Sequence, residues 1–122
     1  MASKQEQHIK FIIVDAINDD IRGLYELNYA LDPFYPKIDH EIELHKKNVL
    51  INLIREGLIS LVRMSDPKFE EIERFDNEES MLILSNRDNW ALADRDWLYG
   101  IVSNDYDKTI ALENELYKEI NT

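Results

Sequence analysis

Two short pieces of this sequence combine residue types that often bind partners or transfer protons. RDNW at residues 87–90 and RDW at residues 95–97 each place an Arg-Asp pair beside a tryptophan, and the chain has no other tryptophan. Tryptophan and arginine are enriched at the energetic centres of protein interfaces, whereas carboxylates can act as general acids or bases. The stretch SNRDNWALADRDWLYG, residues 85–100, is therefore a candidate for catalysis, nucleic-acid recognition or protein binding.

The histidine pair and the aspartate pair elsewhere in the chain do not complete a metal site. His40 and His45 are five residues apart, whereas the zinc motif HExxH places its histidines four apart on one helix face. Five residues rotate a helix by about 500°, so we expect His40 at a helix start and His45 on its solvent side. Asp105 and Asp107 begin like an EF-hand loop, but the glycine and glutamate that such a loop needs are missing.

Nothing else in the sequence forms a pattern typical of an active site. The three glycines of the chain leave no phosphate-binding loop, and carboxylate pairs such as Glu70-Glu71 are too numerous to single one out. We therefore predict a protein that is not an enzyme and that uses no cofactor or metal ion.

Charge is the most informative bulk property. The chain of 122 residues has 25 acidic and 14 basic residues and a net charge of −11, of which residues 65–122 contribute −9 and residues 1–64 only −2. An acidic field repels phosphate backbones and accelerates the association of basic partners, although a need for solubility alone would also explain the negative charge.

The length and the apolar share of 44% predict one folded domain, residues 1–122. The chain lacks cysteine, a membrane-length apolar run and a signal peptide, so we expect a cytoplasmic location.

Hydrophobic spacing predicts mostly helical structure. A stripe from Ile13 to Leu31 indicates one helix within residues 8–34, with a bend or close packing at Gly23 and an end at Asp32-Pro33. Four further elements have clear patterns: a helix at 39–56, a strand at 58–64, a short helix at 77–85 and a strand at 97–103. A last helix at 108–120 should turn Ile110, Leu116 and Ile120 inward, and residues 69–75 fit either helix or strand.

Three polar residues and one glycine set the expected boundaries. Asp39 and Asp76 are predicted N-caps, with Glu79 at the capping-box position after Asp76, and Gly57 is a predicted C′ residue. This order of elements predicts an α+β fold that is mainly helical. Over residues 40–110 it resembles a winged helix, that is, a helical core with a small two-stranded antiparallel ribbon.

The winged-helix resemblance raises DNA binding as an alternative function. The recognition helix would then be 39–56, with Lys46, Lys47 and Arg55 as the phosphate contacts. The same region is rich in acids, which oppose phosphate binding, so we expect no direct contact with nucleic acid.

A protein-binding surface is the favoured interpretation of residues 85–100 and of the acids around them. Trp97 heads a predicted strand and is expected to be a core residue, whereas Trp90 is either a lid on the core or a partner contact. The predicted partner-binding residues are Asp88, Trp90, Asp94, Asp96, Glu78, Glu79, Asp105 and Asp107.

The acidic C-terminal half and the stretch RDNWALADRDW resemble the immunity proteins of bacterial contact-dependent growth inhibition. This resemblance implies a cytoplasmic protein, monomeric or a small homo-oligomer, that binds its cognate toxin domain and blocks the active site or substrate surface. Many such toxins are basic nucleases, so the implied partner is a basic protein, and a winged-helix transcriptional regulator that binds duplex DNA is the alternative.

Overall fold

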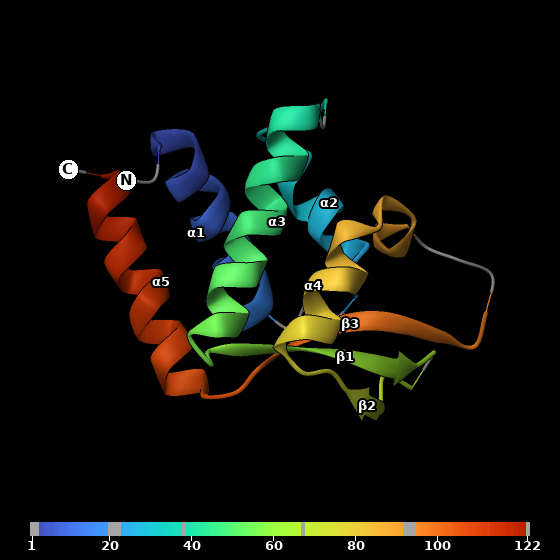
Figure 1. Ribbon diagram of the computed structural model, residues 1–122. Helices are drawn as coiled ribbons and strands as arrows, with labels where there is room; N and C mark the ends of the chain where they lie inside the picture. Colours follow the sequence, from blue (N-terminus) through green and yellow to red (C-terminus); the bar gives the residue numbers. More distant parts are fainter. Residues whose placement is uncertain (1–2, 20–22, 38, 67, 92–94, 122) are drawn as a thin grey trace.

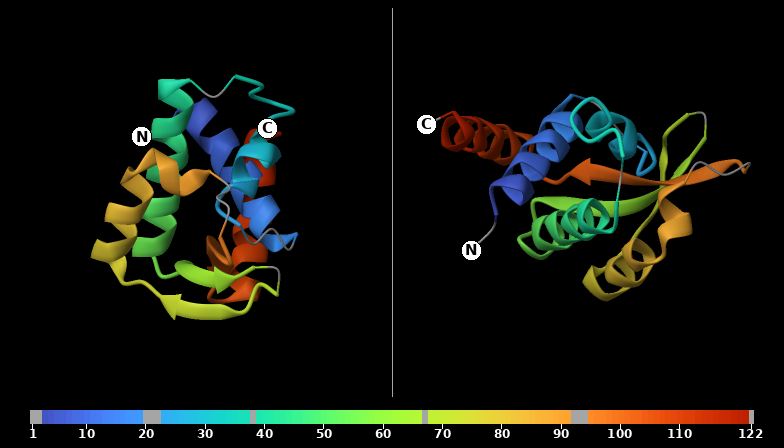
Figure 2. Two further views of the ribbon diagram at one scale, coloured as in Figure 1. Left: turned by 90° about the vertical axis from the view of Figure 1, so that its right-hand side faces the viewer. Right: turned by 90° about the horizontal axis from the view of Figure 1, so that it is seen from above.

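Helices stand side by side above a small antiparallel sheet (Figure 1). The computed structural model describes residues 3–19, 23–37, 39–66, 68–91 and 95–121. The left view of Figure 2 shows the same layers, with the sheet below the helices. The predicted fold class, α+β and mainly helical, is confirmed.

The N-terminal apolar stripe forms two helices, so the prediction of a single helix is wrong. Helix α1 spans Lys4–Asn18 and α2 spans Glu26–Leu31. Between them Gly23 forms an isolated antiparallel bridge with Gly100, and the Leu24 N–H donates to the Tyr99 carbonyl at 2.8 Å. The bend or close packing expected at Gly23 is therefore present, because the chain pairs with a strand there and a Cβ added to Gly23 would lie 2.6 Å from the Tyr25 ring. Ile21, a predicted member of the stripe, lies outside the described residues.

Helix α3, His40–Arg55, is the central helix and has the predicted ends. The Asp39 side chain accepts a hydrogen bond from the Ile42 N–H at 2.9 Å, and Gly57 follows the helix with φ +77°. Helix α3 contacts α1 on one side and α4 (Asn77–Ser85) on the other (Figure 1). The start of α4 is also as predicted, since the Asp76 carboxylate accepts from the Glu79 N–H at 2.8 Å.

The sheet has three described strands in the order β2-β1-β3, so the predicted two-stranded ribbon is incomplete. Strands β1 (Ile59–Ser65) and β3 (Trp97–Ser103) pair along their whole length, from Ile59 opposite Ser103 to Ser65 opposite Trp97. The undecided stretch supplies the third strand, β2 (Glu71–Arg74), which pairs with β1 across a register shift at Arg63/Met64. The winged-helix resemblance is not confirmed.

The C-terminal helix α5, Tyr106–Ile120, starts two residues before its predicted start. Asp105 caps it by accepting from the Lys108 N–H at 3.2 Å. Leu116 is buried as predicted, Ile110 is half-buried, and Ile120 is exposed at 38%, so the inward position expected for Ile120 is wrong. Ile120 is the last residue of α5, so no further turn of the helix shields its side chain from solvent.

The main core lies between the helices and one face of the sheet. It gathers buried side chains from α1, α2, α3, β1, α4 and α5, with Ile13, Leu50 and Leu61 among the most enclosed. A second, smaller cluster of Val62, Met64 and Leu98 lies on the other face of the sheet. Successive strand residues point to opposite faces, so β1 contributes to both clusters.

Candidate functional site

The predicted partner-binding acids do not form one compact site. Asp88 is exposed on the 3-10 helix η1 (Arg87–Trp90), and Asp96 is exposed directly before β3. The strand β3, which is roughly 20 Å long, separates Asp96 at its start from Asp105 beyond its end. Asp94 lies outside the described residues.

Four of the predicted acids instead lie near one end of the sheet, the end at which β2 and β3 both finish. Glu78 and Glu79 occupy the exposed first turn of α4, directly after β2, and Asp105 and Asp107 begin α5. The two segments are joined by a hydrogen bond, in which Arg74 Nη1 donates to Asn104 Oδ1 at 3.0 Å. With the exposed acids of the β2 strand and its turn, they form a surface that we call the acidic edge. Its members are Glu71, Glu73, Asp76, Glu78, Glu79, Asp105 and Asp107.

Arginine neutralises only part of the acidic edge. Arg74 pairs with Glu71 at 2.8 Å and lowers the pKa of that carboxyl through its hydrogen bonds, and Arg63 lies 3.4 Å from Glu73. In the described part of the chain, Glu78, Glu79 and Asp107 form no ion pair. Ile72 on β2 and Leu82 on α4 are exposed at 52% and 76%, so apolar side chains accompany the free carboxylates.

The structure decides between the two alternatives for Trp90 and differs from the expectation for Trp97. Trp90 is 6% exposed, belongs to the main core and donates from Nε1 to the Leu84 carbonyl at 2.9 Å, so it is a core lid. Trp97 is only half-buried, and the Arg95 guanidinium lies 3.8 Å from its ring centroid. Trp97 is less buried because β3 begins where the sheet extends beyond α4 (Figure 1), so its ring is covered by Arg95 and not by a helix.

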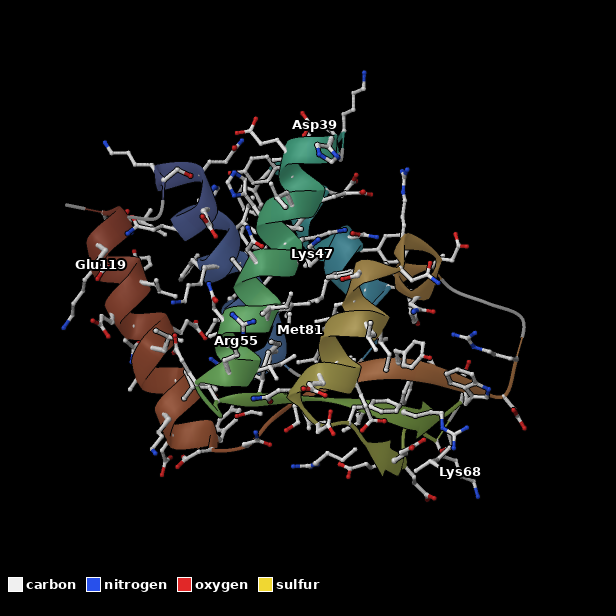
Figure 3. All side chains as sticks on the ribbon, viewed as in Figure 1. Asp39, Lys47, Arg55, Lys68, Met81 and Glu119 are labelled. Carbon is white, nitrogen blue, oxygen red and sulfur yellow. The ribbon has the colours of Figure 1, made fainter. Side chains whose placement is uncertain are left out.

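The predicted DNA-contacting residues do not form an exposed basic surface. Lys46 is buried, with 3% of its surface exposed, and Lys47 is half-buried. Figure 3 shows Arg55 at the lower end of α3, where its Nη2 contacts Met81 Sδ of α4 at 3.4 Å. Because α3 packs against both α1 and α4, it does not project as a reading helix does.

Sequence reasoning missed a hollow between α3, α4 and η1. Its volume is about 190 Å³, and its charged lining comprises Lys46, Lys47, Arg87 and Glu43, with His40 at the start of α3. A second hollow of about 360 Å³ shares Glu43, Lys46, Arg87 and Trp90 with the first. The Glu43 to Arg87 ion pair, with Oε1 and Nε 3.1 Å apart, belongs to both.

Lys46 is the most unusual group in this hollow. Its ammonium donates to Asn28 Oδ1 at 2.5 Å and lies 4.4 Å from the Trp90 ring centroid, a cation–π distance. Burial lowers the pKa of Lys46 from 10.5 to about 8, against the opposing influence of Glu43. The spacing in the sequence could have indicated that Lys46 is buried, since it lies four residues after Ile42 on the buried face of α3. Lysine is usually exposed to solvent, so the residue type indicated the opposite.

The two histidines of α3 are separate, as their spacing predicted. His40 is exposed at the helix start, whereas His45 is largely buried, so the prediction of a solvent-facing His45 is wrong. The His45 ring lies 3.6 Å from Glu6 of α1 and 3.6 Å from Glu41, because α1 covers that side of α3. Within the described ranges, no three His, Asp or Glu side chains converge to hold a metal ion.

No protein-family model matches this chain, and no curated protein or solved structure is significantly similar to it. In the described segments, each helix is too short or too polar to cross a lipid bilayer.

Proposed function

We propose that this protein acts by binding a basic protein partner stoichiometrically, as an inhibitor, and not by catalysis. The observation that carries this proposal is the acidic edge, where Glu78, Glu79 and Asp107 are exposed and form no ion pair with any described residue. Residues 70–79 alone contain six acids and one base. Such a concentration of charge favours association with a positively charged surface.

The most concrete form of the proposal is an immunity protein that neutralises a basic nuclease toxin domain in the cytoplasm. A nuclease must attract phosphates, so its substrate surface is positively charged, and carboxylates of an inhibitor can occupy that surface. The exposed Ile72 and Leu82 would add apolar contact area beside the charges. The resemblance of the chain's C-terminal half to immunity proteins supports this form of the proposal.

The experiment combines capture with inhibition. The protein is immobilised, a lysate of its native organism is passed over it at low salt, and the captured polypeptide is purified and assayed for nuclease activity. We expect one basic polypeptide at equal stoichiometry, whose nuclease activity is abolished by one equivalent of the protein.

A pair of charge-reversal variants assigns the surface. The triple change Glu78→Lys, Glu79→Lys and Asp107→Lys should lower the association rate at least tenfold, since steering depends on local charge. A matched control reverses Asp32, Glu41 and Glu115, which gives the same net charge away from the acidic edge and should retain most of the rate. Equal rates for the two variants would show that the acidic edge is not the binding surface, and a captured protein that is neither basic nor inhibited would refute the proposed function.

A further inference from the structure

Lys46 is a buried cation without a carboxylate partner. In the part of the chain that the structure describes, its ammonium forms no ion pair, and its hydrogen bond goes to the neutral amide of Asn28. Glu43 raises the pKa of Lys46 through its negative charge, but its carboxylate forms an ion pair with Arg87. Buried charges are normally paired or bound to a counter-ion, because desolvation of an isolated charge is costly.

The cations around Lys46 converge on the same hollow. Lys46, Lys47 and Arg87 line it together with one acid, Glu43, so it carries an excess of positive charge in a chain of net charge −11. Arg87 is exposed at 81% of its side chain, so its guanidinium reaches solvent at the rim. An ammonium has three donors, and only one of those on Lys46 has a hydrogen-bond partner among the described residues.

The size of the hollow suits a small molecule. Cavities of roughly 150 Å³ admit a benzene-sized guest, and this hollow measures about 190 Å³. The adjoining hollow of about 360 Å³, which shares Lys46 and Arg87, provides room for the remainder of a larger ligand. Its lining adds Tyr29, which is exposed at 68%, and the carboxylates of Asp32 and Asp88, so the part of the ligand that lies there should not be anionic.

We propose that the hollow between α3, α4 and η1 binds the oxyanion of a small molecule, a phosphate or carboxylate group, through Lys46, Lys47 and Arg87. The oxyanion supplies the counter-charge that Lys46 lacks, and the planar Arg87 guanidinium can donate hydrogen bonds to two oxygens of either group. This proposal concerns a surface other than the acidic edge and does not depend on the inhibitor proposal.

The test is a titration of the ¹⁵N-labelled protein followed by amide NMR spectra, with ionic strength held constant by sodium chloride. Inorganic phosphate is the first probe and acetate is the second. Saturable shifts should be confined to the first half of α3 and to residues 84–90. Saturation by phosphate alone assigns a phosphate ligand, and saturation by acetate alone assigns a carboxylate.

Two arginine variants make the result specific. Arg87→Gln removes an exposed side chain from the rim, so the fold should persist, and the apparent affinity should fall about tenfold, as expected for loss of one charge-assisted contact. Arg55→Gln makes the same charge change on α3 outside the hollow, and its affinity should equal that of the wild type. Absence of saturable shifts with both probes, or an equal loss in the two variants, would overturn the proposal.

Discussion

At the scale of single residues, burial matters more here than residue type. The two Arg-Asp-Trp pieces look equivalent in the sequence, yet Trp90 packs in the core with its indole N–H bonded to Leu84, whereas Trp97 lies under Arg95 at the end of the sheet. Lys46 shows that burial also matters more than type for a charged residue. It lies on the buried face of α3, against the Trp90 ring, and is almost completely shielded from water.

The burial of Lys46 predicts a specific pH dependence of stability. Its pKa falls from 10.5 to about 8 on folding, so between these values the unfolded chain holds the proton more tightly than the folded chain. The free energy of unfolding should therefore rise with pH through this window, by roughly 3 kcal/mol in full. Lys46→Met lacks the titrating group and should not show this rise.

Urea unfolding at pH 7, 8.5 and 10 measures this effect as the difference between the wild type and Lys46→Met. The difference should move in favour of the wild type as the pH rises. Burial also raises the pKa of Tyr25 and of Tyr35, but both tyrosines are present in both proteins and their effects cancel. Parallel pH profiles would show that the Lys46 ammonium is not destabilised by folding.

At the scale of the elements, local signals were reliable wherever one side chain decides a boundary. Asp39 and Asp76 each cap a helix through a carboxylate, as predicted from their type and position. Asp105 caps α5 in the same way, although that helix was expected to start at residue 108. The errors came where pairing with a distant segment decides the structure. Gly23 leaves a helical pattern to pair with Gly100, and β2 forms although all four of its residues are exposed.

The end of α3 provides a test of such a local signal. Gly57 has φ +77°, and a Cβ added there would meet no atom within 4 Å. Gly57→Ala should therefore lower the free energy of unfolding by about 1 kcal/mol through backbone strain alone. Gly57→Asn should lose less, because asparagine tolerates this conformation. Urea unfolding of the three proteins checks the order, and an alanine variant as stable as the wild type would contradict it.

At the scale of the whole molecule, the dominant property is an uneven negative field. Fifteen of the 25 acids lie in residues 65–122, and folding places the ends of β2 and β3, after which α4 and α5 begin, at the same end of the sheet, where Arg74 donates a hydrogen bond to Asn104. Like charges held close together repel each other, so this arrangement opposes folding and is relieved by salt.

Salt should therefore stabilise the folded protein. Raising sodium chloride from near zero to about 0.15 M shortens the screening length to about 8 Å, and the free energy of unfolding should increase by on the order of 1 kcal/mol. The variant with Glu78, Glu79 and Asp107 changed to lysine should respond less than the control variant of equal net charge. Thermal unfolding at several salt concentrations measures this, and identical responses would place the repulsion elsewhere.

The sequence by itself determined the fold class, the helix caps, the strands at 58–64 and 97–103, and the acidity of the C-terminal half, because these depend on local patterns and composition. The third strand, the break at Gly23, the burial of each tryptophan and the hollow around Lys46 were decided only by the tertiary structure. Each of these depends on which distant segment covers a residue. Burial and pairing across the chain are properties of the packed molecule, so no local pattern of residues specifies them.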